Sequence, residues 1–367
     1  MFSSPVTQFG SGTLMVMAGG TGGHVYPAMA VADYMKEHGW NIVWLCTEGG
    51  MENKLIDGKD YKKAMMTMRG VRGKGAVGWL LLPIKLATAF KQSISAIRKH
   101  KPNVVLGMGG FAAFPGGLMA KMLDKPLVIH EQNSIAGLTN KVLSVLANQV
   151  LVAFPSAFAK DLAKGKAQLV GNPVRYEITQ IAAPQQRYAT RTGKLRLLVV
   201  GGSLGAQALN EVLPKALAVM PENTFEVIHQ AGEQHIAALQ ANYHAASRAA
   251  ETKAFIHNMA DMYAWADVVI CRAGALTVAE LACVGVASIL VPFPHAVDDH
   301  QTYNAKYLSD AGAAKLIQQT EFNVQKATQI LQGLTREICL EMAIKAKQLA
   351  KPEATHSVAK ICMELAK

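Results

Sequence analysis

One motif occurs twice in this chain and restricts the folds that it can adopt. The apolar run LMVMA at residues 14–18 leads into the glycine-rich turn at 19–24, and the run LLVV at 197–200 leads into a second turn at 201–205. A buried strand that ends in a glycine turn and continues as a helix presents backbone N–H groups, which suit an anion or a sugar phosphate. Two such units predict an α/β protein with two domains whose strand ends face a shared cleft.

Further strand-like runs are each followed by glycine or a turn and then by a helical pattern, at residues 41–47, 103–110, 127–133, 149–154, 267–274 and 288–294. This alternation predicts parallel sheets flanked by helices. The GNP sequence at 171–173 interrupts the pattern, and a polar, turn-rich segment follows at 182–193. We therefore expect an N-terminal domain at 1–174 and a C-terminal domain at 175–352. Periodicity does not decide which of them the charged helical tail packs on.

The composition favours a globular protein of the cytoplasm. No apolar stretch is long and uninterrupted enough to read as a membrane span, and the N-terminus lacks the basic region of a secretory signal. The cysteines are five, widely spaced and without a C-x-x-C pair, as expected of reduced thiols in the core: Cys46, Cys271, Cys283, Cys339 and Cys362.

The positive charge of the chain is concentrated in its first half. Residues 61–123 contain 11 lysines and arginines and no acidic residue, while the net charge of the whole chain is +11. Cations interleaved with apolar side chains are typical of a patch that binds anionic lipid, here Arg69, Arg72, Lys74, Trp79, Leu80, Leu81 and Lys85. A solvated helix face over a packed core fits the pattern equally well. Nucleic acid is disfavoured because no recognition motif accompanies the basic residues.

The glycine turns do not fit a dinucleotide site. The fingerprint G-x-G-x-x-G needs a third glycine where Val25 stands, and Ser203 occupies the middle glycine position of the second turn. Glu48, just after the second strand, could still bind a cofactor ribose. A nicotinamide-dependent oxidoreductase is therefore the runner-up among enzyme classes.

Two segments carry groups that could do chemistry. His24 stands where the first turn meets its helix, and an imidazole there can act as a general base near neutral pH. Residues 272–280 follow a buried run and open a helix, so that N–H groups near Ala275 to Thr277 point toward a diphosphate beside Arg272. Glu280, one turn on, could accept hydrogen bonds from ribose hydroxyls. The alternative is that Thr277 and Glu280 form only a capping pair.

The acidic and histidine residues at 298–300 do not make a convincing metal site, because two neighbouring aspartates rarely converge on one cation. We favour a polar loop in which Gln301 and Asn304 hydrogen-bond a sugar.

With these segments described, the chain resembles the peptidoglycan N-acetylglucosaminyltransferases of glycosyltransferase family 28. The matching pieces lie in order across nearly the whole chain: GGTGGHVYPA at 19–28, RGVRGKG at 69–75, GMGGF at 107–111, HEQNSIAGLTNK at 130–141, GNPVR at 171–175, GGSLGA at 201–206 and YAWADVVICRAGALTVAE at 263–280. The resemblance implies the GT-B fold of two Rossmann-like domains. It also implies that the last helix, about 353–367, packs back on the N-terminal domain.

The resemblance implies a substrate and a site as well. The donor is UDP-N-acetylglucosamine and the acceptor is lipid I, an undecaprenyl-pyrophosphoryl muramyl pentapeptide that becomes lipid II. The uridine would contact the backbone of Ile256, and the ribose would contact Glu280. The diphosphate would contact Ser203 and the amides of Ala275, Leu276 and Thr277. The full donor set is Thr21, Gly22, Gly23, Asn133, Arg175, Ser203, Ile256, Arg272, Ala275, Leu276, Thr277, Val278, Ala279, Glu280 and Gln301.

The family attaches the sugar with inversion, and we expect His24 to be the base, with Glu131 as the alternative. No cofactor or metal is required by this chemistry, although stimulation by magnesium stays open. The resemblance further implies peripheral binding at the cytoplasmic face of the inner membrane, with other cell-wall synthesis proteins as possible partners. Two positions depart from the family pattern, since Leu204 replaces a common glutamine and the loop at 294–300 is one residue longer than in some relatives.

Overall fold

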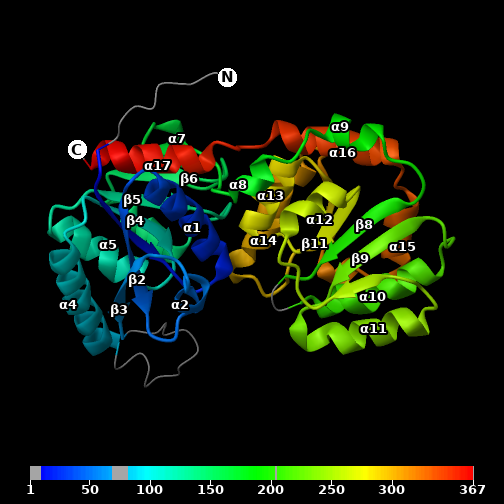
Figure 1. Ribbon diagram of the computed structural model, residues 1–367, viewed down its shortest axis with the longest axis horizontal. Helices are drawn as coiled ribbons and strands as arrows, with labels where there is room; N and C mark the ends of the chain where they lie inside the picture. Colours follow the sequence, from blue (N-terminus) through cyan, green and yellow to red (C-terminus); the bar gives the residue numbers. More distant parts are fainter. Residues whose placement is uncertain (1–9, 68–81, 203–204, 367) are drawn as a thin grey trace. The chain divides into compact units, whose positions relative to one another are not determined.

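The chain forms two α/β units in a computed structural model that describes residues 10–67, 82–202 and 205–366 (Figure 1). Unit 1 comprises Met1–Arg175 and Pro352–Lys367, and unit 2 comprises Tyr176–Lys351. The last helix, α17 (Ala354–Leu365), therefore belongs to unit 1, where Val358 and Cys362 are buried in its core. All five cysteines are buried and free of disulfides.

Unit 1 is built on a parallel sheet of seven strands in the order β3-β2-β1-β4-β5-β6-β7. The strands are β1 (Thr13–Ala18), β2 (Asn41–Thr47), β3 (Lys62–Met66), β4 (Val104–Gly109), β5 (Leu127–Glu131), β6 (Gln149–Val152) and β7 (Ala167–Leu169). The helices between them are α1 (Gly22–Glu37), α2 (Met51–Leu55), α4 (Leu82–His100), α5 (Ala113–Met122), α6 (Leu138–Leu143) and α7 (Ala159–Ala163).

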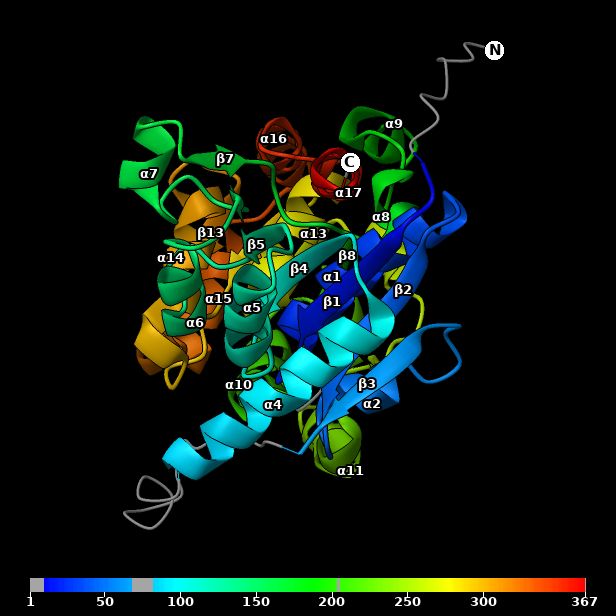
Figure 2. The same ribbon diagram turned by 90° about the vertical axis from the view of Figure 1, so that its left-hand side faces the viewer.

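The continuous apolar runs are explained by burial on both faces of this sheet. Met15 and Met17 of β1 point into a core with α4 and α5, whereas Leu14 and Val16 point into a second core with α1 and α17. Figure 2 shows α4 and α5 in front of the sheet. A strand covered on both sides has no polar face, so its sequence does not alternate.

Unit 2 has a parallel sheet of six strands in the order β10-β9-β8-β11-β12-β13. The strands are β8 (Leu195–Val200), β9 (Phe225–Gln230), β10 (Glu251–Lys253), β11 (Val268–Cys271), β12 (Ala287–Leu290) and β13 (Ala314–Leu316). The helices are α8 (Tyr176–Thr179), α9 (Pro184–Ala189), α10 (Gln207–Ala218), α11 (Ile236–Ala245), α12 (Met259–Trp265), α13 (Ala275–Val284), α14 (His300–Ser309), α15 (Val324–Gln332) and α16 (Arg336–Gln348). Short 3₁₀ turns lie at Glu233–His235, Val297–Asp299 and Gln319–Glu321.

Both sheets reverse their strand order at one point, between β1 and β4 in unit 1 and between β8 and β11 in unit 2. In open α/β sheets the ligand site lies beyond the carboxyl ends of the strands at such a point. The segments that follow these strands include both glycine turns, the GMGGF motif and the residues after β11. The parallel α/β architecture predicted from the sequence is confirmed, and the topology directs attention to these segments in each unit.

Candidate functional site

His24 is oriented by the first glycine turn. This turn ends at Gly22, where α1 begins, and Thr21 is an N-cap residue whose side chain makes no capping hydrogen bond. The first N–H groups of α1, at Gly22 and Gly23, therefore lie at the strand end. Nδ1 of His24 lies 3.1 Å from the carbonyl oxygen of Gly19. A proton on Nδ1 is donated to that carbonyl, which places the basic lone pair on Nε2, as a general base requires.

The end of β4 packs directly on this histidine, and the next residue packs on the first glycine turn. A β-carbon at Gly109 would lie 3.1 Å from Cδ2 and Nε2 of His24, and one at Gly110 would lie 2.4 Å from the carbonyl oxygen of Gly19. Both glycines have positive φ, +98° and +84°. Only glycine permits this backbone and this close approach together. The GMGGF motif thus makes room for the imidazole, a role that its sequence alone did not reveal.

A buried carboxylate lies against the first glycine turn. Glu52 is fully buried and accepts hydrogen bonds from the N and Oγ1 atoms of Thr47, at 2.8 and 2.6 Å. Its Oε2 atom is 3.5 Å from the nitrogen of Gly20 and would be 3.0 Å from a β-carbon at Gly19. This negative charge disfavours a diphosphate at Gly19 and Gly20. The interpretation of both glycine turns as equivalent anion sites therefore loses support in unit 1, and no motif in the sequence pointed to Glu52.

Glu131, the alternative base, is tied into its own loop. Its Oε1 accepts from the backbone nitrogen and Nδ2 of Asn133, at 3.0 and 3.3 Å. Its Oε2 accepts from the nitrogen of Gly137 at 3.0 Å and from Nδ2 of Asn140 at 2.9 Å. The side chain is almost completely buried. Four hydrogen bonds occupy both carboxylate oxygens, so the geometry favours a side chain that shapes the loop over one that meets the acceptor hydroxyl.

In unit 2 the start of α13 has the geometry of an anion site. Its N-cap is Gly274, which has no side chain to cap the helix, and the helix begins at Ala275. The N–H groups of Ala275, Leu276 and Thr277 belong to the first turn, where no intrahelical acceptor is available. Thr277 is the third helical residue, so the alternative that it caps the helix with Glu280 as partner is wrong.

The next residues of α13 differ in what they can contact. Val278 is fully buried in the core, and Ala279 is half-buried. Glu280 is also nearly buried, and its Oε2 accepts a hydrogen bond of 3.2 Å from the hydroxyl of Tyr263 on α12. Ile256 is buried in the connection before α12. A ligand could therefore meet Ile256 only through its backbone atoms, whereas Val278 has no exposed surface and its N–H group donates to the carbonyl oxygen of Gly274 at 2.9 Å.

Arg272 directly follows β11 and donates to carbonyl oxygens that follow β12. Its Nη1 donates to the carbonyl oxygens of Val291 and Pro292 at 3.1 and 3.2 Å, and Nη2 donates to Oε1 of Gln319 at 2.5 Å. The guanidinium also lies 5.5 Å from the ring centroid of Phe293. These contacts place a positive charge at the strand ends and fix the segment that leads to α14.

The two amides expected to bind a sugar have different surroundings. Oε1 of Gln301 accepts a hydrogen bond from the backbone nitrogen of Phe293 at 3.0 Å. The NH₂ group of the same amide therefore points away from Phe293 and could donate to a ligand. Asn304 is fully buried and donates to the carbonyl oxygen of Ala273 at 3.2 Å, so the expectation that it binds sugar is wrong. Among the described residues, no group of three or more His, Cys, Asp or Glu could hold a metal ion.

The remaining predicted residues are placed only in part. Arg175 is half-buried and ends the first segment of unit 1, and Lys85 is half-buried on α4. Outside the described residues lie Arg69, Arg72, Lys74, Trp79, Leu80, Leu81, Ser203 and Leu204.

Known proteins resemble this chain over nearly its full length. The glycosyltransferase family 28 N-terminal domain matches residues 14–152, and the C-terminal domain of the same family matches 196–359. Two curated relatives carry the name UDP-N-acetylglucosamine–N-acetylmuramyl-(pentapeptide) pyrophosphoryl-undecaprenol N-acetylglucosamine transferase. The one from Nitrosospira multiformis is 55% identical and covers 97% of this chain and 99% of its own. The one from Dechloromonas aromatica is 54% identical and covers 97% and 100%.

A solved structure agrees with these relatives. The crystal structure of MurG from Acinetobacter baumannii is similar with a TM-score of 0.83 and 40% identity, covering 96% of this chain and 99% of that one. The expectation of a GT-B fold with two Rossmann-like domains is confirmed by this similarity.

Proposed function

The chain belongs to glycosyltransferase family 28, and from this premise we propose that it transfers N-acetylglucosamine from UDP-N-acetylglucosamine to the muramyl 4-hydroxyl of lipid I. The product is lipid II for peptidoglycan synthesis. The observation that carries the proposal is full-length similarity, at more than half identity, to relatives named for this transfer. Fold alone would not suffice, because Rossmann-like sheets support many chemistries.

We assign donor binding to unit 2. The uncapped start of α13 offers three amides to the diphosphate, and Arg272 adds a cation at the same strand ends. Glu280 would accept the ribose hydroxyls, and the backbone near Ile256 would meet the uracil. The NH₂ group of Gln301 would donate to the sugar, for which Asn133 and Arg175 of unit 1 are further candidates. Val278 is fully buried and would support the start of α13 instead of contacting the donor.

We assign the base to His24. The acceptor oxygen forms a bond to the anomeric carbon while the bond from that carbon to the diphosphate oxygen breaks, with inversion. Nε2 of His24 takes the hydroxyl proton, and the leaving electron pair goes to UDP, whose charge the α13 amides stabilise. The hydrogen bond from Nδ1 to Gly19 supports this tautomer.

Turnover with defined substrates tests the function. The purified chain is expected to transfer N-acetylglucosamine from its UDP donor to lipid I or a soluble analogue. In a thermal-shift screen, UDP-N-acetylglucosamine should raise the Tm, because a ligand that binds the folded state stabilises it. NADH should leave the Tm unchanged, because the proposed site does not bind it. A shift with NADH together with absent transfer would favour the oxidoreductase alternative.

We propose that catalysis needs no metal ion. Helix amides and arginine provide the positive potential that a divalent cation would otherwise supply to the departing diphosphate. Transfer should therefore persist after treatment with EDTA, and added magnesium should alter the rate by only a few fold. Complete loss with EDTA and recovery with magnesium would contradict the proposal.

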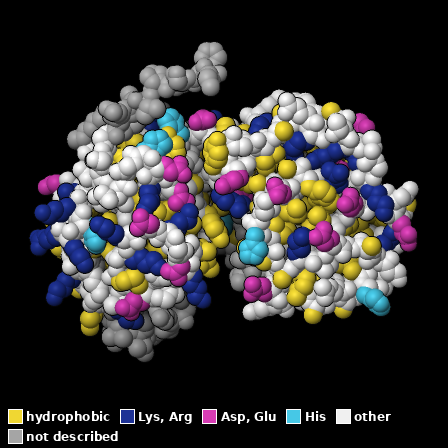
Figure 3. Space-filling model, viewed as in Figure 1, with side chains coloured by type: hydrophobic (Ala, Val, Ile, Leu, Met, Phe, Trp, Pro, Cys, Tyr) yellow, Lys and Arg dark blue, Asp and Glu magenta, His cyan; other side chains and the backbone are white. Residues whose placement is uncertain are grey.

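We also propose that unit 1 binds the cytoplasmic face of the inner membrane. The helices α4, α5 and α6 lie along one face of its sheet and expose Ile84, Met122 and Leu138, and the turn after α6 exposes Val145. Lys85, Lys121 and Lys141 lie on the same helices, and Figure 3 shows Lys and Arg side chains along the side of unit 1 that carries α4. Apolar and cationic side chains together are what an anionic lipid surface recognises. None of the described helices is long and apolar enough to span a bilayer.

Charge reversal distinguishes this proposal from a solvated face. Replacing Lys85, Lys121 and Lys141 with glutamate should reduce cosedimentation with phosphatidylglycerol vesicles at low salt by about tenfold or more, since each cation near the surface contributes about 1 kcal/mol. The matched control reverses the exposed Lys215, Lys306 and Lys326 of unit 2. Equal cosedimentation of both variants would favour the solvated-face alternative.

A further inference from the structure

In unit 2 the carboxylate of Glu280 is hydrogen-bonded by a second residue, Tyr263. Tyr263 of α12 is buried, and its hydroxyl donates the 3.2 Å hydrogen bond to Oε2 of Glu280 on α13. A buried carboxylate needs donors that fix its direction, because an unsatisfied oxygen would cost free energy. Tyr263 thus ties one oxygen of Glu280 to a neighbouring helix and defines where the other can point.

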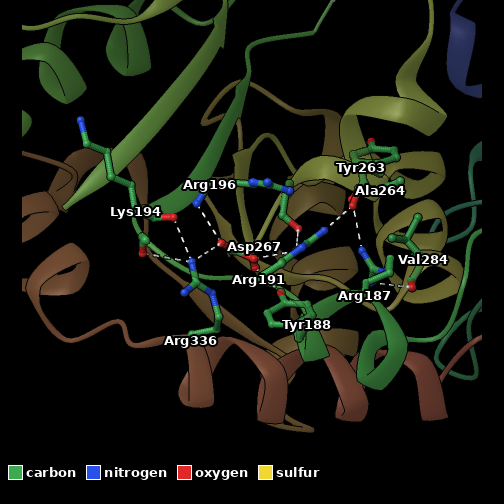
Figure 4. Close-up of polar contacts among 12 residues, drawn as sticks. Arg187, Tyr188, Arg191, Lys194, Arg196, Tyr263, Ala264, Asp267, Val284 and Arg336 are labelled. Carbon is green, nitrogen blue, oxygen red and sulfur yellow. Dashed lines mark hydrogen bonds and ion pairs between the residues drawn. The ribbon is translucent and has the colours of Figure 1, made fainter. Parts of the chain in front are cut away.

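The backbone of Tyr263 is fixed independently of its hydroxyl. Nη1 of Arg187 donates to the carbonyl oxygen of Tyr263 at 3.3 Å, and Nη2 donates to that of Val284 at 3.1 Å and to that of Gly285. Figure 4 shows this guanidinium between the two segments. One side chain from α9 therefore links the later part of α12 to the C-terminal end of α13, the two helices that carry Tyr263 and Glu280.

A second arginine secures the end of α12. Nη1 of Arg191 donates to the carbonyl oxygen of Ala266 at 2.8 Å and to Oδ1 of the buried Asp267 at 2.6 Å. Its Nη2 donates to the carbonyl oxygen of Ala264. These contacts follow Tyr263 directly in the chain (Figure 4). The hydroxyl of Tyr263 is therefore presented from a segment held by charged groups, and it has little freedom to follow Glu280 if that side chain moves.

We propose that Tyr263 is a positioning residue for ribose recognition, whose hydroxyl holds the Glu280 carboxylate in the orientation that accepts the vicinal hydroxyls of a uridine nucleotide. The inference rests on the proposed donor site and adds to it a residue that need not touch the nucleotide. It makes discrimination between ribose and deoxyribose depend on a side chain of another helix.

The test compares the affinities of UDP and 2′-deoxy-UDP by calorimetry on the full chain. Tyr263→Phe should weaken UDP about three- to tenfold, the effect of one lost hydrogen bond. It should weaken 2′-deoxy-UDP less, so the ratio of the two Kd values falls toward that of Glu280→Ala. Because both ligands are measured on one preparation, a reduced folded fraction cancels from the ratio. Tyr263→Met removes the same hydroxyl with an adaptable side chain and should give the same ratio.

Tyr243→Phe is the matched control. Tyr243 is also a buried tyrosine of unit 2, but its hydroxyl pairs with Nδ1 of His229 at 3.0 Å. It should keep the wild-type ratio. A wild-type ratio in folded Tyr263→Phe would overturn the positioning role while leaving the donor site intact. Failure of the wild type to bind UDP would instead refute the proposed function itself.

Discussion

His24→Ala is expected to lower kcat by about 100- to 10,000-fold, the range for loss of a general base, with little change in the Kd for UDP-N-acetylglucosamine. The imidazole belongs to unit 1, while the donor contacts proposed above are mostly in unit 2. Loss of the base should therefore affect the chemical step alone. Transfer rates under saturating substrates and donor affinity by calorimetry measure the two effects separately.

His38→Ala is the control for this variant. His38 follows the same helix at its other end and is exposed. Its Nδ1 donates to the carbonyl oxygen of Tyr34 at 2.7 Å, and its ring stacks on that of Tyr34. Its replacement should leave kcat unchanged. If His24→Ala lowered donor affinity as much as kcat, His24 would have a structural role and would not be the general base.

Glu131→Gln separates the two candidates for the base. The amide keeps the shape of the side chain but replaces one acceptor oxygen with an NH₂ donor. Each oxygen of Glu131 accepts from a backbone N–H group, so the new NH₂ group faces a donor in either orientation of the amide. We expect activity and thermal stability to fall together, because the loop from Asn133 to Asn140 loses its anchor. A large loss of kcat at unchanged stability would return Glu131 to consideration as the base.

Much of the fold could be predicted from strands that are apolar along their length. β1 and β8 are buried on both faces, and their runs stand out without any alternation. β9 was missed because it contains Glu226, His229 and Gln230, although it pairs with β8 at the centre of the sheet. Its His229 is fully buried, and Asn210 and Tyr243 hydrogen-bond both ring nitrogens, at 3.0 Å each. Such pairing partners are distant in sequence and leave no local pattern.

The edge strands were missed for a different reason. β3 and β10 are short and carry lysine or glutamate, as sheet edges do when they avoid pairing with other chains. A few residues with exposed charges do not differ from a loop in sequence. Their identity as strands follows only from their neighbours in the sheet.

The candidate site could be predicted where it depends on local geometry. The start of α13 follows from a buried strand, a glycine and a helical pattern within ten residues. The contacts between Glu52 and the first glycine turn, and between Gly109 and His24, join segments that the sheet topology alone brings together. The burial of Asn304, which excludes it as a sugar ligand, depends on the packing of α14, and the sequence does not encode that packing locally.

Asp267→Asn is expected to destabilise unit 2 by about 3 to 5 kcal/mol, the range for breaking a buried ion pair from one side. Asp267 is fully buried before β11, at the opposite end of that strand from Arg272. Its Oδ1 lies 2.6 Å from Nη1 of Arg191, and its Oδ2 accepts from the backbone nitrogen of Arg196 at 2.9 Å and lies 3.3 Å from Nη2 of Arg336 (Figure 4). Asparagine keeps the volume but leaves two arginines without their carboxylate.

Hydrogen exchange of peptides from β8 and β11 measures this loss in unit 2 itself, where global unfolding could mix the transitions of both units. The matched control is Glu341→Gln, which breaks a surface pair with Lys345 in the same unit and should change protection little, because exposed ion pairs are screened by water. Protection in Asp267→Asn equal to that of the wild type would mean that backbone carbonyls satisfy Arg191 and Arg336 without the charge. The segment that carries Tyr263 would then be held only by hydrogen bonds to its carbonyl oxygens, and Arg187 would be the main donor of these.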